Sequence, residues 1–88
     1  MKHLSIKVSG KVQGVFFRAS TKDIADEIDV KGFVRNERDG SVYIEAEGDD
    51  EKLRQFVEWC HRGPDRAVVS KVEIAELPFQ QFSSFEIR

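Results

Sequence analysis

Residues 10–18 read Gly-Lys-Val-Gln-Gly-Val-Phe-Phe-Arg and separate a predicted strand from a predicted helix that begins near Ala19. Gly10 and Gly14 permit backbone angles that other residues avoid, so the main chain can approach a bound group closely. A helix N-terminus directly after such a loop adds partial positive charge. Arg18 supplies a cationic fork suited to phosphate or carboxylate. The stretch therefore predicts an anion-binding loop, while a plain strand-to-helix turn with a surface arginine is the alternative.

Composition limits the class of protein. Eighty-eight residues, 40% of them hydrophobic and seven of them Phe, are enough for one small domain over residues 1–88 with a compact core. A net charge of −2 argues against a nonspecific nucleic-acid binder. The single Cys60 excludes an internal disulfide and an all-cysteine metal site. A strand that starts directly after Met1, with no apolar leader and no run of about 20 apolar residues, predicts a cytoplasmic protein outside the membrane.

Hydrophobic periodicity defines the order of the elements. Alternation predicts strands, and apolar residues three and four apart predict helices. The first expected helix runs from Ser20 to about residue 30 and has acidic residues in its early turns. The second runs from a cap at Asp49 to His61. The second helix has an apolar stripe of Leu53, Phe56, Val57 and Cys60. The expected strands are Leu4–Val8, Gly32–Asn36, Val42–Gly48, residues 68–77 and a short one at 85–87.

This order, β-α-β-β-α-β with a tail strand, predicts an α+β fold. We expect a two-layer sandwich of ferredoxin-like topology, in which two helices cover one face of an antiparallel four-stranded sheet and a short C-terminal fifth strand is possible. The first two strands should run parallel with the third between them, so their C-terminal ends reach the same sheet edge. The loop with Arg18 and the strand-ending Asn36 should therefore lie close together.

Two motifs carry a resemblance to a known family. Residues 10–18 are similar to the first signature of the acylphosphatase family, and Gly-Phe-Val-Arg-Asn at 32–36, followed by Gly40-Ser41-Val42 and Gly48, is similar to the second. The resemblance implies a hydrolase that splits an acyl phosphate into a carboxylate and inorganic phosphate, without metal, cofactor or phosphoenzyme. It implies that Asn36 positions the attacking water and that Arg18 and the backbone N–H groups of the loop bind the phosphoryl group. Those loop residues are Gln13, Gly14, Val15, Phe16, Phe17 and Arg18.

Alternatives come from the same broad architecture. An acylphosphatase-like domain that binds an anion without hydrolysis would carry the same loop. An RNA-binding module would stack bases on aromatic residues such as Phe33 and Tyr43 on the open sheet face, but the acidic strand at 41–47 lacks the basic-aromatic signature. A metal chaperone would need a Cys-x-x-Cys loop, which is absent. A monomer is the expected state.

Several reactive residues are expected to be inert. His3 and His61 lie in different elements with no carboxylate or cysteine at ligand spacing, which predicts no metal site. Cys60 falls on an apolar helix stripe and is expected in the core. Thr21, in the first helical turn, is expected to support the loop, and the Gln13 side chain is expected to orient the loop or to contact substrate.

Overall fold

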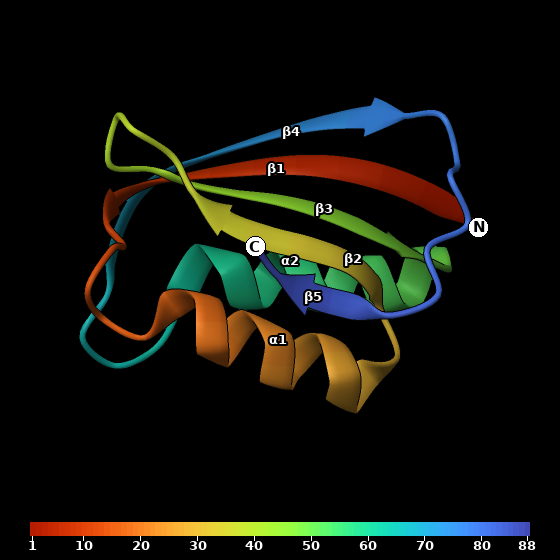
Figure 1. Cartoon of the computed structure of the whole chain (residues 1–88), viewed down its shortest axis with the longest axis horizontal. Helices are drawn as coiled ribbons and strands as arrows, with labels where there is room; N and C mark the ends of the chain where they lie inside the picture. The colour runs from red at the N-terminus through yellow and green to blue at the C-terminus, as the bar shows by residue number, and fades with distance from the viewer.

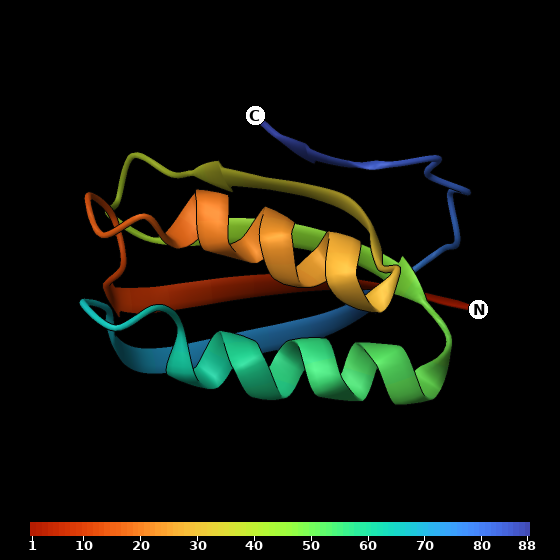
Figure 2. The same cartoon turned by 90° about the horizontal axis from the view of Figure 1, so that it is seen from below.

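The computed structural model describes residues 1–88 as a five-stranded sheet with two helices on one face (Figure 1). The view turned by 90° shows both helices in one layer beneath the strands (Figure 2). Neither helix is long and apolar enough to cross a membrane. In chain order the elements are β1 (Lys2–Lys11), α1 (Phe17–Ile28), β2 (Lys31–Asn36), β3 (Val42–Gly48), α2 (Asp50–Arg62), β4 (Val68–Leu77) and β5 (Phe85–Ile87).

The sheet has the order β4-β1-β3-β2-β5. Strand β3 pairs antiparallel with both β1 and β2, so β1 and β2 run parallel on either side of it, as predicted. The C-terminal strand exists and pairs parallel with β2, the one parallel contact in the sheet. This topology confirms the ferredoxin-like α+β class and brings the ends of β1 and β2 to the same edge.

The core lies between the helices and the sheet. Ile6, Ile44 and Val34 face each other across β1, β3 and β2 and are fully buried. Both predicted helix stripes point to this layer, because Ala25 of α1 and Phe56 of α2 are also fully buried. The alternation of apolar residues along the strands therefore identified the helix-covered face correctly.

Strand β1 is longer than the sequence predicted. It continues through Gly10 and Lys11, with a shift in register after Ser9, and pairs there with the start of β4. Gly10 has a φ of 125°, and a Cβ at this position would lie 2.2 Å from the carbonyl oxygen of Val68. Gly10 thus permits close approach of β4, and its assignment to the anion-binding loop was wrong.

The two helices begin differently. Helix α2 is capped by Asp49, whose side chain accepts a hydrogen bond from the N–H of Lys52, and Asp50 and Glu51 lie in its first turn. Helix α1 starts at Phe17, earlier than predicted, after a Phe16 that makes no side-chain cap. It has no acidic residue in its first turn, because its earlier start leaves Asp23, the first of the expected acidic residues, in the second turn. The start of α1 is therefore free of protein anions.

The face opposite the helices is not an open aromatic surface. Phe33 and Tyr43 lie on it, but the guanidinium of Arg88 sits 4.2 Å from the ring centroid of Phe33, and that of Arg35 sits 4.8 Å from that of Tyr43. Phe82 packs edge-on against Phe33 at 5.9 Å. Only 4% of the Phe33 surface is exposed. These contacts leave no free platform on which a base could stack.

His3 is buried on that same face, where the sequence had suggested an isolated residue. The register of β1 and β3 places it between two carboxylates, with Nε2 2.6 Å from Glu45 Oε1 and Nδ1 2.7 Å from Glu47 Oε2. Sequence spacing did not indicate these two carboxylates, because the pairing crosses strands. Both ring nitrogens are occupied by these contacts.

Candidate active site

The loop between β1 and α1 has an unusual run of free backbone donors. Gly14 and Phe16 both have left-handed backbone angles, with φ of 74° and 64°. None of the N–H groups from Gln13 to Ala19, here called the loop amides, donates to a protein acceptor; the first paired one is Ser20, which donates to the Phe16 carbonyl at 3.0 Å. Alternating left- and right-handed residues and a helix start both form concave anion sites. The loop amides therefore offer donors to an external anion.

The loop is held in place by Gln13. Its Nε2 donates to the carbonyl oxygens of Glu37 at 2.8 Å and Ser41 at 3.0 Å, on the turn between β2 and β3. That turn is itself fixed, because Asp39 accepts hydrogen bonds from the N–H and hydroxyl of Ser41. The Lys7 ammonium and these bonds hold the pKa of Asp39 well below its usual range. With both amide protons donated to the turn, the Gln13 side chain orients the loop.

Two further residues support the start of α1. Thr21 is fully buried, and its hydroxyl donates to the Phe17 carbonyl at 2.7 Å. The Phe17 ring packs against Trp59, with centroids 5.4 Å apart, and against Gly63, where a Cβ would lie 2.7 Å from the ring. Thr21 thus has the supporting position that the sequence predicted. Phe17 contributes its side chain to the core and its N–H to the loop amides.

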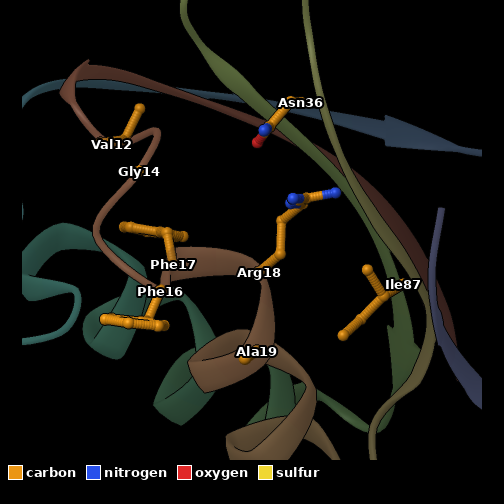
Figure 3. A pocket seen from close by; sticks show the side chains of 8 residues that line it. All are labelled: Val12, Gly14, Phe16, Phe17, Arg18, Ala19, Asn36 and Ile87. Carbon is orange, nitrogen blue, oxygen red and sulfur yellow. The ribbon is translucent and has the colours of Figure 1, made fainter.

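Arg18 and Asn36 lie in one pocket of about 360 Å³ (Figure 3). Arg18 projects from the first turn of α1, and Asn36 projects from the end of β2 toward it. Both are exposed, and neither side chain is hydrogen bonded or ion paired within the protein. The pocket is lined by Val12, Gly14, Phe16, Phe17, Arg18, Ala19, Asn36 and Ile87. The convergence predicted from the topology is therefore present.

The pocket also contains residues that were not predicted to bind phosphate. Val12 directly precedes the predicted binding residues 13–18, and Ala19 follows them and continues the loop amides by one residue. Ile87 reaches the pocket because β5 lies beside β2, where Ile87 pairs with Val34. The amphipathic pattern of residues 85–87 predicted a strand but carried no signal for its neighbour. Val15, in contrast, is 4% exposed and places its side chain in the core.

The chemistry of the pocket is cationic and neutral. Its lining includes one charged group, Arg18, one amide, Asn36, and no Asp, Glu, His or Cys. It therefore provides anion binding and hydrogen bonding but no carboxylate or imidazole that could act as a general base. An exposed cation beside unpaired N–H groups suits a phosphoryl group, whose oxygens accept several hydrogen bonds at once. These features define a phosphoryl-binding protein on a ferredoxin-like scaffold.

Comparison with known proteins agrees with this class. The acylphosphatase family model matches residues 4–87, so the chain belongs to the acylphosphatase family. An acylphosphatase of Marinobacter nauticus is 54% identical over 79 residues, which is 89% of this chain and 86% of that one. The family motifs predicted at residues 10–18 and 32–36 thus lie in a chain that is related over most of its length.

Solved structures extend the agreement to the fold. An acylphosphatase from Bacillus subtilis has a TM-score of 0.97 at 35% identity, covering 100% of this chain and 99% of that one. An acylphosphatase from Coxiella burnetii has a TM-score of 0.95 at 38% identity, covering 99% and 92%. The protein is a hydrolase of acyl phosphates, which yields a carboxylate and inorganic phosphate. The regulatory and RNA-binding alternatives gain no support.

Proposed function

We propose that the loop amides and Arg18 hold the phosphoryl group of the acyl phosphate and that Asn36 positions the attacking water. The observation that carries this proposal is a pocket in which unpaired hydrogen-bond donors converge from the loop before α1, from the start of α1 and from the end of β2. The N–H groups of residues 13–19 and the side chains of Arg18 and Asn36 are all unpaired. Donors already in place stabilise developing charge without reorganisation.

The substrate needs little more from the protein. The carboxylate of an acyl phosphate is a good leaving group, so hydrolysis depends mainly on positioning and on stabilising charge on the equatorial oxygens. Water oxygen attacks phosphorus, the bond from phosphorus to the acyl oxygen breaks, and a carboxylate leaves. Because the pocket lining has no general base, a phosphoryl oxygen accepts the proton of the water. In this scheme Asn36 orients the water through its amide and remains neutral.

Two substitutions separate binding from chemistry. Arg18→Ala should weaken both competitive inhibition by inorganic phosphate and turnover, because the cation faces the phosphoryl group in each case. Asn36→Ala should keep phosphate inhibition and lose turnover by about a hundredfold or more, as for loss of a preorganised donor. Hydrolysis of benzoyl phosphate in EDTA, with phosphate as inhibitor, measures both effects and tests metal independence.

The outcomes are distinct. Unchanged phosphate affinity in Arg18→Ala would contradict its binding role. Full activity in Asn36→Ala would contradict water positioning. A carboxylate or histidine substitution that abolished activity in the folded protein would contradict the substrate-assisted proton transfer.

We also retain a single domain over residues 1–88, a monomer, a cytoplasmic setting and no nucleic-acid partner as proposals. Cys60 is free and fully buried, and burial raises the pKa of its thiol, so we propose no reactive role for it. The covered rings of Phe33 and Tyr43 argue against base stacking. Sedimentation at several protein concentrations tests the monomer, and cell fractionation tests the location.

A further inference from the structure

Phe16 and Phe17 are adjacent in sequence and have opposite surroundings. Phe17 is 2% exposed and packs against Trp59, whereas Phe16 is 75% exposed and makes no aromatic contact. Phe16 also has a φ of 64°, a left-handed conformation that is unfavourable for a bulky residue. The backbone of Phe16 is therefore strained, although its exposed ring makes no aromatic contact that would offset the strain. Strain of this kind is concentrated at binding sites.

The position of Phe16 indicates what its ring can contact. Phe16 lines the same pocket as Arg18 and Asn36. In Figure 3, Asn36 lies above the Arg18 guanidinium, whereas Phe16 lies lower on the loop with its ring pointing away from Asn36, and Ala19 lies on the helix below Arg18. Ile87, which is 44% exposed, adds apolar surface to another wall. The pocket thus has a polar end at Asn36 and an apolar end at Phe16.

The geometry of the reaction connects these two ends. In phosphoryl transfer the attacking and leaving oxygens lie roughly in line through phosphorus. If the water is held at Asn36, the acyl group leaves on the side away from Asn36, which is the apolar side. We propose that the Phe16 ring, with Ala19, contacts the acyl group and makes the site selective for acyl phosphates with an apolar, above all aromatic, acyl group. This inference rests on the proposed roles of Asn36 and the loop amides.

The test compares two substrates that share the phosphoryl group and differ in the acyl group. The measured quantity is the ratio of kcat/KM for benzoyl phosphate to kcat/KM for acetyl phosphate. Any effect of a substitution on the common phosphoryl chemistry cancels in this ratio. Phe16→Asn removes the ring but retains a residue that tolerates the left-handed conformation, so the loop keeps its shape. Phe16→Leu restores apolar surface without an aromatic face.

A matched control is available in Phe79. Its side chain is 47% exposed, and it follows β4, at the opposite end of the sheet from the loop after β1 (Figure 1). We expect the ratio to fall about tenfold in Phe16→Asn, the scale of one lost aromatic contact with its apolar area. It should recover in part in Phe16→Leu and keep the wild-type value in Phe79→Asn.

The possible results separate this inference from the proposed function. An unchanged ratio in Phe16→Asn, with wild type hydrolysing both substrates, overturns the acyl contact and leaves the phosphoryl site intact. An equal fall in Phe79→Asn overturns it as well, because the effect would then not come from the pocket. Wild type that hydrolyses neither substrate overturns both the contact and the proposed function. A fall confined to the Phe16 variants supports the contact.

Discussion

Two groups of backbone N–H donors in this protein differ in what they hold. The loop amides at residues 13–19 have no protein acceptor. At the other sheet edge, the N–H groups of Gln80, Gln81 and Phe82, here called the tail amides, donate to the Glu47 carboxylate at 2.5, 3.1 and 2.6 Å. Each group includes a non-glycine residue with left-handed backbone, Phe16 with a φ of 64° and Gln81 with a φ of 62°. The chain thus uses one kind of local geometry twice.

This comparison explains why the loop amides have no acceptor within the protein. The tail amides are satisfied by a side chain that is 2% exposed, and they anchor the segment between β4 and β5 to the sheet. No carboxylate lines the pocket beside the loop amides. Because unpaired donors at a helix start attract anions, the loop amides are open to the proposed phosphoryl group, whereas the tail amides are already satisfied by the Glu47 carboxylate. The tail site also shows that consecutive N–H groups of this chain hold a carboxylate.

The largest predicted effect is on stability and comes from removing the Glu47 carboxylate that the tail amides share. Glu47→Ala leaves the tail amides and His3 without their shared acceptor, so we expect a loss of about 3 kcal/mol in the free energy of unfolding, measured by urea denaturation. Glu76→Ala, an exposed carboxylate on β4, is the control and should change it by less than about 0.5 kcal/mol. Equal losses in the two variants would remove the structural role of the tail site.

Phosphate bound to the loop amides should instead raise the free energy of unfolding. Inorganic phosphate at about a hundred times its dissociation constant should stabilise wild type by about 2.7 kcal/mol, because it binds only the folded state. Arg18→Ala should show much less stabilisation at the same phosphate concentration. Thermal unfolding with a phosphate titration measures both. Stabilisation of equal size in the two proteins would place the anion elsewhere.

The smallest effect concerns pH. Burial alone would raise the pKa of Glu47, but hydrogen bonds from Gln80, His3, Phe82 and Gln81 outweigh it and lower that pKa below its usual 4.5. The carboxylate therefore contributes stability above pH 4.5 that is lost as pH falls toward the folded-state pKa, by at most about 1.4 kcal/mol per pH unit.

The matched variant for this titration is Glu47→Gln, which cannot ionise. The difference in free energy of unfolding between wild type and Glu47→Gln should shrink as pH falls from 6 to about 3.5. A difference that is constant over this range would show that Glu47 has the same pKa in the folded and unfolded chains.

The functional end of the molecule was largely predictable from the sequence. Arg18 and Asn36 are 18 residues apart, but the element order makes β1 and β2 parallel, and parallel strands end at one edge. Apolar periodicity gave most of that order, because each helix has one apolar stripe and strands β1 and β3 alternate, whereas β2 is buried at three consecutive residues. Only short-range patterns and one topological rule were needed to bring these two side chains together.

The contacts around Glu47, at the opposite end of the sheet, could not be predicted because they join residues that are far apart in the sequence. His3 meets Glu47 through the β1–β3 register, and a shift of one residue would send these side chains to the other face. The tail amides reach Glu47 from 33 to 35 residues away through a segment without regular structure. Likewise, nothing in a Phe-Phe pair indicates which ring is buried; the left-handed angle at Phe16 decides it.

The bridge made by Gln13 has a consequence for folding. Its two hydrogen bonds join the loop to carbonyl oxygens 24 and 28 residues further along the chain. We therefore expect the loop to be held in the shape seen here only once the β2–β3 hairpin has closed and docked beside β1. An intermediate with β1 and α1 formed but no hairpin would contain every residue of the first motif and still bind phosphate weakly. If the loop binds phosphate as proposed, affinity for phosphate during refolding should follow the docking of the hairpin and not the formation of the local helix.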